Sequence, residues 1–200
     1  MNRLFVTLLL LLGFASVAHA EKADATKPTN VEANHMEYDD IKQVNVFTGD
    51  VVLTRGTILM KADKMVVRQD PAGYQYVTLY AAPGKLASFK QKRDGGDDEW
   101  IDGQAERIEY DDKTEIVKLY SKARMRRLQG DKPTDEVDGP FISYDTRAEF
   151  FTVHNSPNGE SKPGGGRITA IIQPRNVQQQ QAQPPQPQRP PQPQPQQKGQ

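Results

Sequence analysis

Residues 46–68, VFTGDVVLTRGTILMKADKMVVR, carry the clearest structural pattern in the chain. Apolar residues recur at every second position, as at Val51 and Leu53, on both sides of an Arg-Gly corner at residues 55–56. Period-2 spacing places such residues on one face of a pleated strand, and glycine permits the chain to reverse. We predict strand, turn, strand, turn and strand, with the second turn at residues 61–64. No single strand here buries its apolar face alone, so the rest of the chain must cover it.

An internal repeat surrounds this stretch. The segment ANHMEYDD at residues 33–40 returns as AERIEYDD at residues 105–112, an offset of 72 residues, and half-copies follow at residues 62–67 and 139–145. Each full copy places Ala, an apolar residue and Tyr on one side and ends in Asp-Asp. Repeated strand–turn–strand units predict an elongated β-structure whose units stack and share one continuous core.

Short strand-like runs separated by turn residues fill most of the remaining chain. Helical periodicity is missing after residue 20, and clusters of glycine, proline and aspartate punctuate the runs. This pattern predicts an all-β fold. The charged stretch at residues 91–99 is predicted to be a mobile loop. The further expected strands are residues 76–80, 86–90, 100–103, 150–154 and 168–172.

The first twenty residues have the form of a secretory signal peptide. Arg3 precedes an apolar run at residues 4–14, and Ala18 and Ala20 provide the small residues of a cleavage site before Glu21. The run is too short for a membrane span, and no cysteine follows it that could carry a lipid. We therefore predict an exported protein cleaved between Ala20 and Glu21; a membrane anchor is the alternative.

The remaining chain divides into three parts. We expect residues 21–28 to be flexible, residues 29–174 to form one folded domain and residues 175–200 to be a disordered tail. The tail is rich in Gln and Pro and nearly lacks apolar side chains, so it cannot bury enough surface to offset the loss of chain entropy. A solvated tail and weak attraction to an anionic surface are both compatible with its unopposed basic residues.

Composition excludes several classes of partner and site. The chain has 26 basic and 26 acidic residues, so cleavage that removes Arg3 leaves one acidic residue in excess. A nucleic-acid partner would need a clustered basic face, and we predict none. Cysteine is absent, which excludes disulfides and thiolate metal sites. In the run RMRR at residues 124–127, basic residues flank Met125. This pattern is compatible with a solvated outer face and with a rim that contacts anionic headgroups.

Catalysis has little support in the sequence. His35 and His154 lie far apart and lack metal-ligand spacing. Paired carboxylates at residues 39–40 and 111–112 would serve as general acid and base in a β-helix enzyme that acts on polysaccharide, but Asp-Asp after Tyr is also a turn signal. We predict no catalytic residue, no metal site and no cofactor. A secreted polysaccharide-active β-helix enzyme and a purely structural envelope scaffold remain as alternatives.

Several motifs in fixed order resemble the OstA-like family of lipopolysaccharide-transport proteins. They are VEANHMEYD at residues 31–39, FTGDV through RGTI to ADK within residues 47–64, GQA through YD at residues 103–111, and RIT with a following Ile at residues 167–172. The resemblance covers residues 29–174. The chain departs from the family at one corner, where Ser121 replaces the usual glycine, which leaves the geometry of that corner open.

The resemblance implies a fold and a function. The fold is a β-jellyroll, or β-taco, in which two antiparallel sheets form an open V with an apolar groove. The function is that of a non-enzymatic periplasmic carrier in Gram-negative bacteria that needs no cofactor and binds the lipid A of lipopolysaccharide. Such carriers stack head to tail into a bridge from the inner to the outer membrane. LptC feeds the bridge at the inner membrane, and the N-terminal domain of LptD receives the lipid at the outer membrane.

Apolar alternation and the resemblance together predict the groove. Each acyl methylene exposed to water costs about 0.8 kcal/mol, so a carrier needs a continuous apolar face, which period-2 strands provide. Phe89 and Tyr110 correspond to family positions near bound lipid, and residues 31–38 and 150–172 are the predicted stacking edges. The predicted lining residues are Val31, Met36, Tyr38, Val51, Leu53, Ile58, Met60, Met65, Val67, Phe89, Ile108, Tyr110, Val117, Leu119, Met125, Ile142 and Tyr144.

Overall fold

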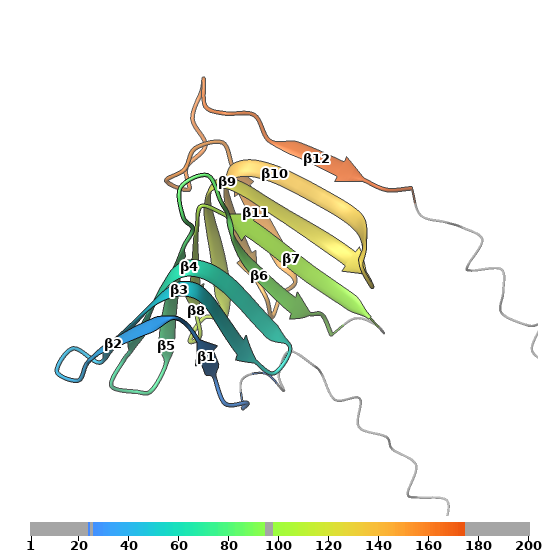
Figure 1. The fold of residues 1–200 in the computed structure, drawn as a ribbon. Helices are drawn as coiled ribbons and strands as arrows, with labels where there is room; N and C mark the ends of the chain where they lie inside the picture. The colour runs from blue at the N-terminus through green and yellow to red at the C-terminus, as the bar shows by residue number, and fades with distance from the viewer. Residues whose placement is uncertain (1–23, 25, 95–97, 175–200) are drawn as a thin grey trace, which may run out of the picture.

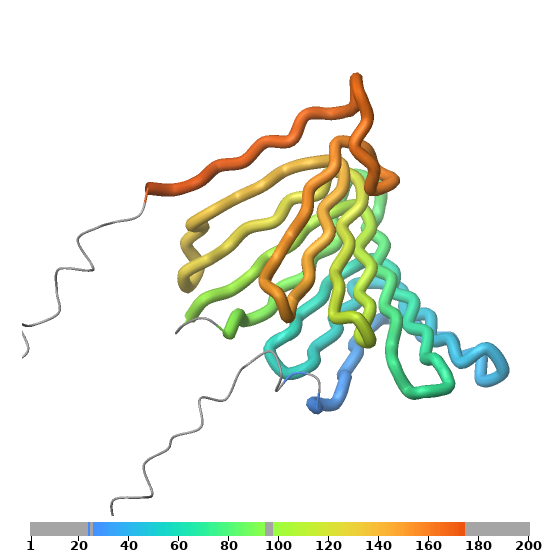
Figure 2. The backbone as a smooth tube through the Cα atoms, turned by 180° about the vertical axis from the view of Figure 1, so that it is seen from behind, coloured from blue at the N-terminus to red at the C-terminus, as the bar shows by residue number. Residues whose placement is uncertain are grey.

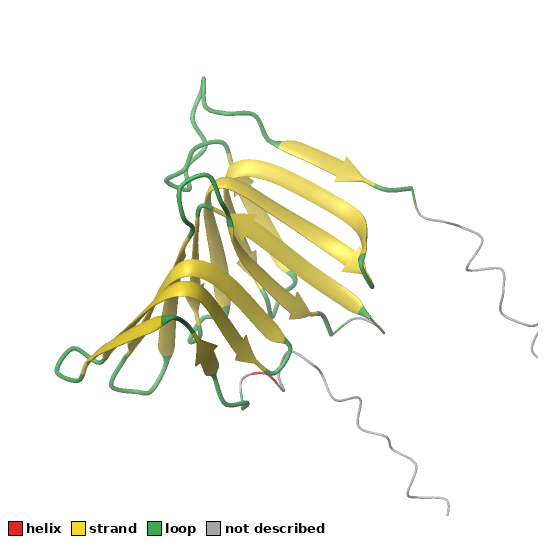
Figure 3. Cartoon of the chain, viewed as in Figure 1, coloured by secondary structure: helices red, strands yellow, loops and turns green. Residues whose placement is uncertain are grey.

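A computed structural model describes residue 24, residues 26–94 and residues 98–174. The predicted signal peptide, its cleavage site and the tail at residues 175–200 lie outside the described residues. Apart from a single helical position at Asp24, every secondary-structure element of the described chain is a β-strand, which confirms the predicted all-β class (Figures 1 and 3). The strands are β1 (Asn30–Glu32), β2 (His35–Asp39), β3 (Val44–Arg55), β4 (Ile58–Gln69), β5 (Gln75–Tyr80), β6 (Ala87–Lys92), β7 (Glu99–Ala105), β8 (Arg107–Asp111), β9 (Ile116–Gln129), β10 (Lys132–Asp145), β11 (Phe150–His154) and β12 (Thr169–Ile172).

The strand network folds into two antiparallel sheets that share four long strands. Each of β3, β4, β9 and β10 pairs with different neighbours in its two halves. Sheet one has the order β2–β3–β4–β5–β8–β9–β10–β11, and sheet two has the order β1–β3–β4–β6–β7–β9–β10–β12. Figures 1 and 2 show the sheets diverging from the bends of the shared strands as the two arms of a V.

The bends occur where the backbone adopts left-handed conformations. On β3, Gly49 and Asp50 have φ angles of 82° and 47°, and the register with β4 shifts between Thr48 and Val51. On β9, Ser121 and Lys122 have φ angles of 61° and 50° at the positions 72 residues later. Ser121, which stands where the family usually has glycine, therefore forms the same corner. Because Ser121 has a Cβ atom, its left-handed conformation costs about 1 kcal/mol of strain.

The predicted internal repeat is confirmed by the strand pairing. Strands β1 and β2 pair with the two halves of β3 in the same register in which β7 and β8 pair with β9. Strands β5 and β6 then pair with β4 as β11 and β12 pair with β10. Two six-stranded units, β1–β6 and β7–β12, are joined by the β5–β8 and β6–β7 pairings.

One local prediction is wrong, and the bounds of another differ in the structure. The turn predicted at residues 61–64 is absent, since β4 continues through these residues and bends together with β3. The loop predicted at residues 91–99 is shorter than expected, because β6 runs to Lys92 and β7 begins at Glu99, and residues 95–97 lie outside the described chain. Gln91 at its start is only 3% exposed, and Arg93 pairs with Glu99. Residues 61–64 are held extended by pairing with the preceding strand β3, and Arg93 contacts Glu99 across the hairpin formed by β6 and β7.

Inward-facing apolar residues form continuous rows across the sheets. Paired positions in sheet one give a row from β2 to β11, and those in sheet two give a row from β1 to β12. The core lies between the rows, and no helix of the described chain has the length and apolar character needed to cross a membrane. The row of sheet one is Met36, Phe47, Met65, Leu79, Ile108, Leu119, Ile142 and Val153, and that of sheet two is Val31, Leu53, Met60, Phe89, Gly103, Met125, Val137 and Ala170.

Candidate functional site: the apolar groove between the sheets

The predicted lining residues meet between the two sheets. All except Val31, Met36 and Tyr38 belong to one buried apolar cluster, and Val31 packs against it. The rings of Phe89 in sheet two and Tyr110 in sheet one stack with centroids 6.4 Å apart. Burial of the Tyr110 hydroxyl raises its pKa, so this side chain is neutral at physiological pH. The inner faces are therefore apolar and contact each other directly.

The row of sheet one ends at the surface. Met36 and Tyr38 are 53% and 51% exposed, and they lie on β2, which is at the edge of sheet one and pairs only with β3 in the described chain. At the other end, β11 and β12 expose Phe150 and Ile172. Among the strands that the structure describes, these four each pair on one side only, so the predicted stacking regions contain the unpaired edges of both sheets.

Ion pairs join the sheets on the side of the V opposite the bends, which we call the mouth. It lies where the turns that follow β8 and β10 in sheet one face the turns that follow β3 and β6 in sheet two. The Nη1 atom of Arg55 donates to Oδ1 of Asp112 at 2.7 Å, and Nη2 of Arg93 donates to Oε2 of Glu149. Arg93 also donates to Glu99 at 2.9 Å. Burial acts to lower the pKa of Arg93, but the carboxylates of Glu149 and Glu99 outweigh it, so the pKa is raised.

Asp24, the first residue that the structure describes, also lies at the mouth. Its carboxylate accepts hydrogen bonds from the backbone N–H and the hydroxyl of Thr57, both at 2.6 Å, and from the amide of Gln91 at 3.2 Å. A Cβ atom at Gly56 would lie 2.0 Å from Oδ1 of Asp24. Although Asp24 falls within residues 21–28, which are predicted to be flexible, it is only 2% exposed because these donors hold it.

The paired carboxylates mostly stabilise turns. The Asp39 carboxylate accepts the backbone N–H of Lys42, and Asp111 accepts those of Lys113 and Thr114. These contacts explain the repeated Asp-Asp without a catalytic role. Within the described residues, no group of three or more His, Asp or Glu side chains is arranged to hold a metal ion.

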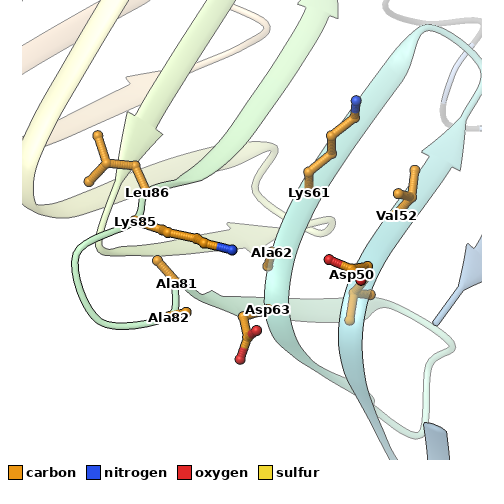
Figure 4. Close-up of a pocket in the computed structure, with 10 residues that line it drawn as sticks. Asp50, Val52, Lys61, Ala62, Asp63, Ala81, Ala82, Lys85 and Leu86 are labelled. Atoms are coloured by element: carbon orange, nitrogen blue, oxygen red, sulfur yellow. The ribbon is translucent and has the colours of Figure 1, made fainter. Parts of the chain in front are cut away.

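A separate pocket of about 270 Å³ lies beside the bends of β3 and β4, next to the linker from β5 to β6. Asp50, Lys61, Asp63 and Lys85 surround short apolar side chains, and Figure 4 shows Lys85 extending from the linker toward β4. Its charges are of both signs and lie at its exposed edge. This arrangement indicates no particular ligand, and the packed apolar interface between the two sheets remains the candidate site.

Comparison with known proteins agrees with this geometry. A family model described as "LptA/(LptD N-terminal domain) LPS transport protein" matches residues 30–150. The chain belongs to this family. Among its relatives, the lipopolysaccharide export system protein LptA of Haemophilus influenzae is 29% identical over 165 residues, which cover 82% of this chain and 88% of that protein. The Escherichia coli K12 protein of the same name is 28% identical over 180 residues, covering 88% and 89%.

A crystal structure of another LptA-family member has the same fold. It is LptH, the LptA homologous periplasmic component of the conserved lipopolysaccharide transport device from Pseudomonas aeruginosa. The match has a TM-score of 0.65 and 26% sequence identity, and covers 76% of this chain and 99% of that chain. The predicted OstA-like β-jellyroll is thereby confirmed.

Sequence reasoning missed the charged residues of the mouth. Arg55 and Asp112 are 57 positions apart, and Arg93 and Glu149 are 56 positions apart, so no local pattern connects them. One signal was available: Arg55 continues the inward alternation of Val51 and Leu53, which places a charge at the end of an apolar face.

Proposed function

We propose that this chain is a non-enzymatic periplasmic carrier that holds the acyl chains of lipopolysaccharide between its two sheets. The observation that carries the proposal is the pair of apolar rows, which give a continuous dry surface from one end of the molecule to the other. Burying an acyl chain of about twelve carbons is worth on the order of 10 kcal/mol at about 0.8 kcal/mol per methylene. The names of the LptA relatives and of LptH support lipopolysaccharide as the cargo.

In the structure, the lining residues of the two sheets contact each other. This arrangement suits a carrier that must also release its cargo. Without lipid, Phe89, Leu119 and Met125 are buried in the shared apolar cluster, and Phe89 stacks on Tyr110 of the opposite sheet. With lipid, the acyl chains replace that surface, so the protein exchanges one apolar contact for another. We infer that this exchange offsets part of the affinity and lets cargo pass onward.

We propose that copies stack head to tail, and the repeat within one chain indicates how. Inside the chain, β8 pairs with β5 and β7 pairs with β6. The free strands β11 and β12 are the repeat equivalents of β5 and β6, and β2 and β1 are the equivalents of β8 and β7. A second copy would therefore pair its β2 with β11 and its β1 with β12. Such a contact does not close on itself and gives filaments.

The same edges suggest the partners at the two ends of the stack. The family description includes the LptD N-terminal domain, so that domain should have comparable edge strands and receive the lipid at the outer membrane. We propose LptC as the donor at the inner membrane.

We also propose that the N-terminal segment directs export to the periplasm and is removed by cleavage between Ala20 and Glu21.

Native mass spectrometry of the mature protein with purified lipopolysaccharide, over a range of protein concentrations, tests the proposal. We expect a ladder of oligomers that carry lipid, with longer species at higher concentration. Lipid-free monomers at every concentration would contradict the carrier and favour a structural scaffold with a permanently packed core.

A further inference from the structure

Three arginines occupy inward-facing positions at the mouth of sheet two. Arg55 follows Leu53 by two residues on β3, and Arg127 follows Met125 by two residues on β9. Arg93 directly follows β6 and stands two positions after the buried Gln91. Because alternate residues of a strand share a face, Arg55 and Arg127 continue the apolar inner face to its polar end, and Arg93 follows directly after the end of β6.

Each arginine reaches across the mouth to sheet one. Arg55 and Arg93 pair with Asp112 and Glu149, and their side chains are only 11% and 16% exposed. The guanidinium of Arg127 lies 5.8 Å from the ring centroid of Phe151 on β11. Contacts made by three separate strands or turns of sheet two thus span the opening through which acyl chains would enter.

Each arginine also has an acceptor on its own side of the mouth. Nε of Arg55 donates to the carbonyl oxygen of Asp24 at 3.1 Å, Arg93 donates to Glu99 at 2.9 Å, and Arg127 lies 3.7 Å from Asp135. Separation of the sheets would break the contacts to sheet one but keep these. The guanidinium groups would then stay at the mouth with donors directed toward whatever enters it.

We propose that Arg55, Arg93 and Arg127 form a binding site for phosphate groups on the head of the acylated cargo. The inference rests on the proposed carrier function, since acyl chains held between the sheets would place the polar head at the mouth. Guanidinium binds phosphate through two parallel charge-assisted hydrogen bonds. The phosphates replace Asp112 and Glu149 as partners, so opening the groove leaves no buried arginine unpaired.

Arginine-to-glutamine variants test the site with two lipid probes, lipid A that carries its phosphates and the same lipid after their removal. R127Q and R93Q should each reduce the preference for the phosphorylated over the dephosphorylated lipid about 10-fold, the size expected for a charge-assisted contact. R124Q is the matched control, because Arg124 lies on the outer face of β9 and pairs with Asp138 at 2.7 Å. Equal losses for both lipids, or equal effects of R127Q and R124Q, would overturn the proposal.

The carboxylate partners separate a phosphate site from a simple closure of the mouth. D112N and E149Q break the same ion pairs but keep the arginines, so they should strengthen binding of phosphorylated lipid A relative to the dephosphorylated form. If the arginine variants and the carboxylate variants change lipid binding in the same direction, the ion pairs only hold the mouth closed, and the proposed phosphate site is refuted. The double variant R55Q/D112N avoids an unpaired buried charge and should reproduce the loss seen in R93Q.

Two further measurements separate the possible explanations. One shows whether the bound phosphate must belong to a lipid headgroup, and the other shows whether a negative result contradicts the carrier function or only the arginine site. Inorganic phosphate alone should not displace phosphorylated lipid A, because nothing holds it at the mouth; displacement would refute a headgroup site. Wild-type protein that binds neither lipid would contradict the carrier function itself. Wild-type protein that binds both lipids equally well would contradict only the arginine site.

Discussion

The paired corners of the repeat allow a matched test of how the V is built. Replacing Gly49 by Ala puts a Cβ at a φ of 82°, which costs about 1 kcal/mol, and 2.6 Å from Nδ2 of Asn34, which must move. We expect the free energy of unfolding to fall by about 1–2 kcal/mol in G49A. The reverse change at the equivalent corner, Ser121→Gly, removes a strained φ of 61° and should raise it by about 0.5–1 kcal/mol.

Urea denaturation followed by far-UV circular dichroism measures both effects. With a slope of about 2 kcal/mol per molar urea, the midpoint should fall by roughly 0.5–1 M in G49A and rise by roughly 0.3–0.5 M in S121G. The slope itself should not change, since both variants keep the same buried core. A neutral G49A together with a destabilised S121G would refute the reasoning, because side-chain contacts and not backbone strain would then determine the corner.

Three other perturbations follow from the same structure. Phe89→Ala removes a ring with 0% exposure and should lower the free energy of unfolding by about 3–5 kcal/mol in a urea titration. Met36→Lys, at a 53% exposed edge position, should change that free energy by less than about 0.5 kcal/mol but shorten the oligomers seen by sedimentation velocity. Asp24→Ala leaves the donors of Thr57 and Gln91 without their acceptor and should destabilise by about 1–3 kcal/mol in thermal unfolding.

Exposed residues on the same elements or turns provide the controls. Ile41, in the turn after β2, is 96% exposed, and Ile41→Lys should leave both stability and oligomer length close to wild type. Oligomers that persist unchanged in Met36→Lys would contradict pairing through the β2 edge. A Phe89→Ala variant as stable as wild type would mean that the sheets do not pack through this ring, and a neutral Asp24→Ala would mean that its hydrogen bonds are replaced by water.

The sequence predicted those features that depend on local alternation and repetition. Alternation at Val51 and Leu53 gave the strands and their inner face, and the copies at residues 33–40 and 105–112 gave the two-unit architecture. Both work because a strand exposes alternate side chains to one environment, whatever its partner is. Met36 pairs with the buried Phe47, but Met36 and Tyr38 are exposed because β2 lies at the edge of its sheet, which local alternation does not show.

Features set by distant pairing could not be predicted. Residues 61–64 contain charged side chains typical of a turn, yet β3 and β6 pair with the adjoining part of β4 and keep it extended. In the sequence, the charge of Arg93 is typical of a solvated loop. In the structure, Arg93 pairs with Glu149, which lies in the turn that follows β10. Charged residues that end an apolar face are ambiguous in sequence, because solvent and a paired carboxylate satisfy them equally.

Photo-crosslinking with adjacent residues of opposite orientation tests the central claim most directly. A photoreactive side chain placed at Phe89 or Leu119, which face the groove, should capture lipopolysaccharide in cells that transport it. The same side chain at Lys90 or Lys118, the neighbours on the outer face, should capture none. Alternation of capture along the strands would establish the groove as the lipid site. Equal capture at both members of each pair would contradict it.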